Sequence, residues 1–247
     1  MNWQAPQKPS AWAEARLIEA ILDGDFPAGS NLPAERDLAE RLGVTRPTLR
    51  EALQRLARDG WVEIRHGLPT RVRDYWREGQ LAVLVAMVER PERMPEDTVP
   101  NLLEVRQAMA PVYTAQAVAR NPRAVCDLLA PYPDLPDTPA DFTAADWQLH
   151  HALSVLSGNP VYTLMLNGFR GLYAAMGLRY FALPDARAAS RAFYAALFEA
   201  ASRADMRVAE QVTRAMMAHS LAYWKRAVAA AGDGQSRPEE QPPAGSP

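Results

Sequence analysis

The sequence predicts a mainly α-helical protein in two parts. Three helices and a short β-hairpin come first, and an all-α antiparallel helical bundle follows. Apolar side chains recur at helical spacing through most of the chain, which is typical of amphipathic helices. Strand-like alternation is confined to two short stretches on either side of a turn with glycine and proline. The predicted divisions are residues 1–74 for the first part, 75–80 for a connector, 81–231 for the bundle and 232–247 for a disordered tail.

The first two helices are predicted from their ends. Ser10 is a suitable N-cap for a helix over residues 11–23, and a loop with several glycines and prolines follows it. The second helix is expected over residues 34–42, because Gly43 is typical of the position just beyond a helix end.

The third helix, over residues 46–59, has an apolar and a basic face. Thr45 caps it, Gly60 ends it, and Pro47 lies in the first turn, where a missing amide proton breaks no intrahelical bond. The leucines that repeat at i, i+4 and i+7, and so should face the core, are Leu49, Leu53 and Leu56. The side chains expected outside are Arg46, Thr48, Arg50, Arg55 and Arg58.

The hairpin completes a winged helix-turn-helix. Residues 61–65 and 70–73 alternate as strands, and the intervening turn has His66 and Gly67 at its tip. Such a tip is narrow enough to enter a DNA minor groove. For His66 alone, an exposed loop histidine is an equally good interpretation.

The charge distribution favours DNA as the partner of the third helix. Residues 46–73 hold seven arginines against three acids, on a chain whose net charge is only −2. Arg46 and Arg50, one turn apart near the helix N-terminus, are predicted to contact base edges. A solvated helix face is the ordinary alternative, but the complete order of three helices and a hairpin favours DNA. The residues placed for phosphate contacts are Arg36, Thr45 and Thr48.

Composition restricts the compartment. The single cysteine, Cys126, forms no intrachain disulfide, which favours a reducing compartment. Residues 1–10 contain no apolar segment typical of a secretion signal, and the longest apolar run, residues 81–88, is too short to span a membrane. We expect a cytoplasmic protein with no membrane partner.

The second part is read as helices separated by proline and glycine breaks. A loop with four prolines covers residues 131–139, and a Ser-Gly-Asn-Pro break follows residue 156. The helices expected in the bundle cover residues 101–120, 124–129, 142–156, 161–180, 186–201 and 205–231.

Polar side chains on apolar helix faces suggest an effector site in the bundle. Arg106 lies beside Leu102 and Leu103, and a buried cation is costly without an anionic partner. A ligand phosphate or carboxylate is the favoured partner, and an internal acid is the alternative. For any one tyrosine, an ordinary core position is the commoner explanation. The candidate effector-binding residues are Arg106, His150, Asn167, Tyr173, Tyr180, Tyr194, Ser220 and Trp224.

The motifs resemble a known family of bacterial regulators. Residues 32–60 resemble the GntR family, and residues 55–61 with the hairpin residues 66–70 are similar to its FadR subgroup. The resemblance continues into the bundle, so it covers nearly the whole chain apart from the tail and the proline-rich loop. The stretches that carry it there are residues 101–106, 157–162, 166–173, 179–182, 184–187 and Trp224.

The resemblance implies a homodimeric transcription regulator of fatty-acid metabolism. It would bind a palindromic operator with Arg36, Arg46 and Arg50 in the major groove and His66 in the minor groove. It would repress degradation genes, activate unsaturated fatty-acid synthesis genes and release DNA when long-chain acyl-CoA enters the bundle. Pro47 stands where the subgroup has a threonine, so a hydroxyl and an amide donor are missing from that phosphate contact.

A metal-assisted carboxylate sensor is the alternative function. Asp146 and His150 share a helical face at i and i+4, and His219 could join them. A related GntR branch binds metal through one aspartate and three histidines, and Tyr194 stands where the third histidine would be. Hydrogen-bonded histidines in a polar cavity are the favoured interpretation of this cluster.

An enzyme is the least supported class. The sequence shows no nucleophile–base pair, phosphate-binding loop or repeated metal-ligand motif. We therefore predict no catalytic residues and no cofactor, with the acyl-CoA as an effector.

Overall fold

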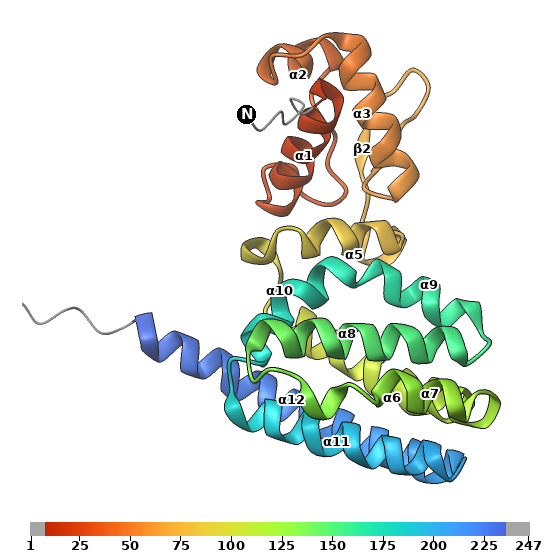
Figure 1. Ribbon diagram of the computed structural model, residues 1–247. Coiled ribbons are helices and arrows are strands. Elements are labelled where there is room, and N and C mark those ends of the chain that lie inside the picture. Colours follow the sequence, from red (N-terminus) through yellow and green to blue (C-terminus); the bar gives the residue numbers. More distant parts are fainter. Residues whose placement is uncertain (1–7, 236–247) are drawn as a thin grey trace, which may run out of the picture. The chain divides into compact units, whose positions relative to one another are not determined.

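The computed structural model describes residues 8–235 and confirms the predicted fold class. It is mainly helical, with one two-stranded antiparallel sheet (Figure 1). The contacts divide the chain after Met94 into two compact units.

The first unit contains the three helices and the hairpin. Its elements are α1 (Pro9–Leu22), α2 (Glu35–Arg41), α3 (Arg46–Asp59), β1 (Val62–Glu63), β2 (Arg71–Val72), α4 (Tyr75–Glu78), α5 (Leu81–Val88) and the 3₁₀ helix η1 (Pro91–Arg93). α1 packs on α3, and α2 packs on α3 as in a helix-turn-helix. In the hairpin Val62 is paired with Val72, and Glu63 with Arg71. The strands are shorter than predicted, which leaves residues 64–70 as an open wing.

Helix α3 has the predicted bounds because both of its ends are fixed locally. The Thr45 hydroxyl accepts a hydrogen bond from the Thr48 amide at 3.3 Å. Gly60 ends the helix at φ 94°, and a Cβ there would lie 2.9 Å from the Cα of Gly79. The three leucines of its inner face are buried, as predicted: Leu49, Leu53 and Leu56.

Helix α5 differs from the sequence-based division of the chain. Residues 81–88 were assigned to the second part, whereas Val83 and Met87 are buried in the core of the first unit with Leu17 and Trp61. The segment is apolar on every side, so its periodicity does not indicate which core it joins. Whether the functional domains divide at residue 80 or nearer to Met94 stays a prediction.

The second unit is an all-helical bundle. Its elements are α6 (Thr98–Arg120), α7 (Pro122–Leu129), the 3₁₀ helix η2 (Tyr132–Asp134), α8 (Pro139–Leu156), α9 (Pro160–Gly168), α10 (Arg170–Tyr180), α11 (Pro184–Ser202) and α12 (Met206–Gln235). α6 packs on both α12 and α8, α11 packs on α12 and α7, and α10 packs on α8. The largest buried side chains at the centre include Tyr113, Phe142 and Leu149.

Two predictions for this unit are wrong in detail. The helix expected over residues 161–180 is two helices, because the chain leaves helical geometry at Phe169, between Gly168 and Arg170. Residues 232–235, expected in the tail, continue α12, whereas residues 236–247 lie outside the described part of the chain. Within residues 8–235, no helix combines the length and the apolar character needed to cross a membrane.

Candidate functional site

The residues predicted to contact DNA lie on two adjoining helices and the wing tip of the first unit. Arg46 and Arg50 are exposed in the first turns of α3, and Arg36 is exposed on α2. The Thr45 and Thr48 hydroxyls lie 2.8 Å apart at the start of α3. Pro47, His66 and Gly67 are also exposed. All eight are therefore available to a ligand, and their DNA contacts stay a prediction.

One arginine of α3 has a different role from the one expected. Arg55 is half-buried and donates hydrogen bonds to Ser10 Oγ and Glu14 Oε2 on α1, each at 3.2 Å. It also pairs with Glu51 one turn before it. Arg55 therefore joins α3 to α1 and does not lie on the outer face. The i,i+4 spacing from Glu51 is the sequence signal that could have indicated this pairing.

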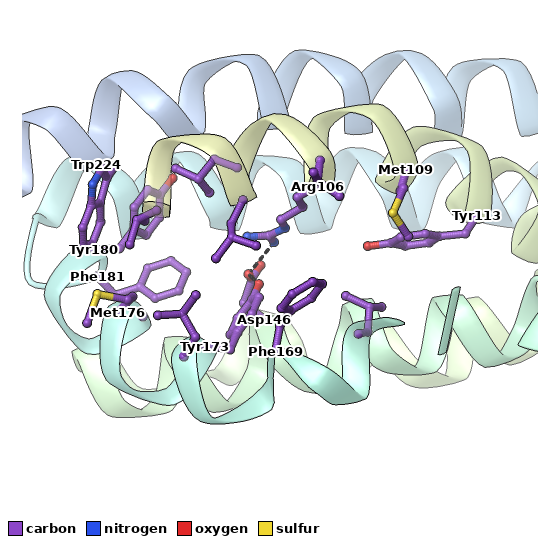
Figure 2. Close-up of a pocket in the computed structure, with 17 residues that line it drawn as sticks. Arg106, Met109, Tyr113, Asp146, Phe169, Tyr173, Met176, Tyr180, Phe181 and Trp224 are labelled. Carbon is purple, nitrogen blue, oxygen red and sulfur yellow. Dashed lines mark hydrogen bonds and ion pairs between the residues drawn. The ribbon is translucent and has the colours of Figure 1, made fainter. Parts of the chain in front are cut away.

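The second unit contains an elongated apolar pocket with about 850 Å³ of empty space, the part open to solvent included. Figure 2 shows Trp224 and Tyr180 at one end, Met109 and Tyr113 at the other, and Arg106 beside Asp146 between them. The apolar side chains that complete the lining come mainly from α6, α9 and α10: Val99, Leu102, Leu103, Val105, Leu166, Phe169, Leu172, Met176 and Phe181.

Three polar side chains surround Asp146 at the middle of this pocket. Arg106 Nη2 lies 2.8 Å from Asp146 Oδ2, and the Tyr173 hydroxyl donates a hydrogen bond to the same oxygen. Tyr194 OH donates to Asp146 Oδ1 at 3.1 Å. The favoured partner of Arg106, a ligand anion, stays a prediction. The internal acid left as the alternative is the partner, 40 positions away in the chain.

Both members of the Arg106–Asp146 pair are charged. Burial alone would raise the pKa of Asp146, but the charge of Arg106 and a hydrogen bond from Tyr173 hold it below its ordinary value. Burial alone would lower the pKa of Arg106, yet its acidic and tyrosine neighbours raise it. The two charges at the middle of the apolar pocket thus neutralise each other, although Arg106 Nε is buried without a hydrogen-bond partner.

His150 is a fully buried neutral histidine behind this network. Its Nδ1 lies 2.7 Å from the Tyr113 hydroxyl, and its Nε2 lies 3.8 Å from Asp146 Oδ1. Burial, and then the charge of Arg106, lowers the pKa of His150 to about 3. The ring also stacks on Phe193.

Comparison with known proteins assigns the chain to a family. The family model for bacterial regulatory proteins of the gntR family matches residues 9–72, and the model for the FadR C-terminal domain matches residues 73–231. The chain belongs to the GntR family. It is a transcription regulator of the GntR/FadR type, the fatty acid metabolism regulators.

Curated relatives agree with this assignment, and one solved structure shares the fold. Fatty acid metabolism regulator proteins of Shewanella denitrificans and Edwardsiella ictaluri are 43% and 44% identical to this chain, and each alignment covers 88% of this chain and 91% of the relative. These homologues are transcription regulators and not enzymes. Lar, which controls the agr system of Listeria monocytogenes, matches 92% of this chain and 99% of its own at a TM-score of 0.55 and 16% identity, which indicates a shared fold.

Four of the eight predicted effector residues of this regulator line the pocket: Arg106, Tyr173, Tyr180 and Trp224. His150 and Tyr194 belong to the network behind it. Asn167 is exposed and bonded to His151, and the Ser220 hydroxyl donates to the Met216 carbonyl. The apolar lining was missed as a site because a leucine facing a pocket and a leucine facing a core have the same sequence pattern.

The alternative metal site is not formed. His219 is exposed on α12, whereas Asp146 and His150 are buried, and Asp146 is held by Arg106 and two tyrosines. Among the residues that the structure describes, no three histidine, cysteine, aspartate or glutamate side chains are grouped as metal ligands. The i,i+4 spacing was correct, but the third ligand lies on the wrong face of its helix.

The buried His150 is expected to make the second unit less stable in mild acid. Below pH 6.5 an unfolded histidine takes up a proton, while the folded His150 stays neutral until about pH 3. The unfolded state then binds more protons, so stability falls as pH falls through this window, by up to about 1.4 kcal/mol per pH unit. Urea unfolding between pH 6.5 and 4.5 measures this slope.

Two matched variants separate the contribution of His150 to this pH dependence from that of the other titrating groups. His150→Gln is expected to reduce the slope by the contribution of one proton, whereas His219→Gln, at an exposed position, is expected to leave it unchanged. Equal slopes in the wild type and His150→Gln would show that His150 is not buried in its neutral form.

Proposed function

We propose that this regulator binds a palindromic operator as a homodimer and releases it when long-chain acyl-CoA occupies the pocket of the second unit. The observation that supports this most is the elongated apolar pocket. Its target genes would be those of fatty-acid metabolism. It would repress the genes of fatty-acid degradation and activate those of unsaturated fatty-acid synthesis. It would act in the cytoplasm as a regulator and not as an enzyme.

The pocket suits an acyl chain. Its walls are leucine, methionine and aromatic side chains, which is typical of sites for apolar ligands. Each methylene removed from water contributes about 0.8 kcal/mol, so a long chain is favoured over a short one. The chain would pass the Arg106–Asp146 pair, which is already neutralised internally.

The end of the pocket near Trp224 suits the CoA head. The Arg179 guanidinium lies over the Trp224 ring at 5.6 Å from its centroid, and Lys225 and Arg226 are exposed beside it on α12. Arginine and lysine are the side chains that bind phosphates. A thioester near Trp224 would therefore place the CoA phosphates among these cations and the acyl chain inside the pocket.

On the DNA side, we propose that Arg46 and Arg50 contact guanines while the threonines and Arg36 contact phosphates. Two α3 helices related by a dimer axis would enter successive major grooves of a palindrome. The wing tip with His66 and Gly67 would enter the adjacent minor groove.

Calorimetry with the full chain tests the effector. Palmitoyl-CoA is expected to bind more tightly than palmitate or coenzyme A alone, because each of these has only half of the contacts, and a chelator should change nothing. Met176→Trp, which fills the pocket, is expected to weaken binding, whereas Met206→Trp at an exposed position of α12 is not. Equal affinities for coenzyme A and palmitoyl-CoA would refute an acyl-binding pocket.

A further inference from the structure

An ion pair joins the two helices of the helix-turn-helix at the DNA-reading surface. Arg50 Nε lies 2.7 Å from Oε2 of Glu35, the first residue of α2. In the described part of the chain, Nε is the only Arg50 side-chain nitrogen that donates a hydrogen bond to another residue. The Arg50 side chain is 60% exposed and that of Glu35 is 32% exposed, so the free end of the guanidinium faces solvent.

This pair differs from the other arginine contacts of the surface. Arg36 and Arg58 each contact the aspartate next to them in sequence, which fixes neither side chain relative to another helix. Arg50 contacts a residue 15 positions earlier. An acid at the start of a helix is favoured by the helix dipole, but Asp37 serves that purpose in the same turn without reaching α3.

The choice of nitrogen determines which edge of Arg50 remains free. A guanidinium has five N–H donors in a rigid plane and can present either its terminal edge or its Nε edge to a partner. With Nε occupied, only the edge formed by the two terminal nitrogens is left. That edge matches O6 and N7 of guanine in a bidentate contact.

We propose that Glu35 is a positioning residue for base reading, which binds Arg50 Nε and thereby aims its terminal nitrogens at a guanine. The proposal rests on the base-reading role of Arg50 proposed above. This role explains why an acidic residue lies at a surface that should attract DNA phosphates. The charge of Glu35 weakens non-specific attraction to DNA, and the orientation of Arg50 increases discrimination between base pairs.

The test uses a duplex that the wild-type protein selects from a random library, with each guanine replaced in turn by 7-deazaguanine, which lacks N7. The wild type is expected to lose about tenfold in affinity at one guanine per half-site. Glu35→Gln is expected to lose less than threefold there, because a neutral amide oxygen holds Arg50 Nε more weakly than a carboxylate does. Its affinity for unrelated duplex is expected to stay equal or increase.

Glu40→Gln is the matched control. Glu40 is exposed on the same helix, has no side-chain partner among residues 8–235, and the substitution removes the same charge. It is expected to keep the tenfold loss at the same guanine. A purely structural role of Glu35 would weaken binding to all duplexes alike and leave the 7-deazaguanine effect intact, which would overturn the proposal.

Arg50→Ala separates this proposal from the function on which it rests. If Arg50→Ala abolishes the 7-deazaguanine effect but Glu35→Gln keeps it, Arg50 reads the base and the role of Glu35 is refuted. If Arg50→Ala keeps the effect, both are refuted. In the Arg50→Ala background, Glu35→Gln should change no base preference. A further loss there would identify Glu35 as a direct reader, for example of a cytosine amino group, and would also overturn the proposal.

Discussion

Arg50→Ala is expected to remove most of the preference of this regulator for its operator over unrelated duplex. A bidentate contact between arginine and guanine contributes about 1–3 kcal/mol of discrimination. A dimer on a palindrome uses the contact twice, so the preference is expected to fall by about 2–6 kcal/mol. The affinity for unrelated duplex should fall only by the small amount expected for the loss of one positive charge per protomer. The ratio of the two dissociation constants at one salt concentration is the measurement.

Arg58→Ala is the control for this loss. Arg58 is an exposed arginine of the same helix, but it lies in the last turn and contacts Asp59. It is expected to keep the operator preference. Both variants should bind palmitoyl-CoA as the wild type does, because the pocket lies in the other unit. An unchanged preference in Arg50→Ala would exclude α3 as the base-reading helix.

Asp146→Ala is expected to destabilise the second unit by about 3–5 kcal/mol. The change leaves Arg106 as a largely buried cation and removes the acceptor of two tyrosine hydroxyls. Replacing both partners, in Asp146→Ala with Arg106→Met, should recover most of the loss, because no unpaired charge then remains. Unfolding in denaturant, monitored by circular dichroism, measures the free energy of unfolding of the single and the double variant.

The pair between Asp137 and Arg187 provides the comparison, because its carboxylate is exposed and its guanidinium has other acceptors. Asp137 is well exposed, and its pairing lowers its pKa mainly through a hydrogen bond from Arg187. Asp137→Ala is expected to change stability far less than Asp146→Ala, because the lost carboxylate is exposed and Arg187 keeps its hydrogen bonds to the Phe181 and Ala182 carbonyls. Equal losses from the two aspartate variants, or no recovery in the double variant, would mean that Asp146 and Arg106 are not buried together.

The parts of the fold that were predicted well are those with local signals. Helix α3 has the predicted bounds, since Thr45 and Gly60 fix its ends through contacts within a few residues. The break at Phe169 was missed although glycines precede and follow it, because apolar spacing continues through the break. The packing of α5 depends on contacts with α3 and with the core of the first unit, which its uniformly apolar sequence does not specify.

The candidate site could be predicted only where a polar residue stood out from an apolar pattern. Arg106 was found for that reason, but its partner was not, because Asp146 lies on another helix and only tertiary packing brings the two together. Tyr194 and His150 were correctly noticed as unusual, yet they support Asp146 and do not line the pocket. The glutamate that contacts Arg50 was treated only as part of α2, since helix spacing does not relate residues on different helices.

The most direct test of the account is a titration of palmitoyl-CoA into the complex of the full chain with a fluorescently labelled, library-selected duplex, followed by anisotropy. We expect saturating ligand to lower DNA affinity about a hundredfold, which corresponds to about 2.7 kcal/mol of coupling between the two sites. The pocket-filled Met176→Trp should stay on the DNA at the same ligand concentration. Undiminished DNA binding by the wild-type protein at a palmitoyl-CoA concentration that calorimetry shows to be saturating would contradict the account.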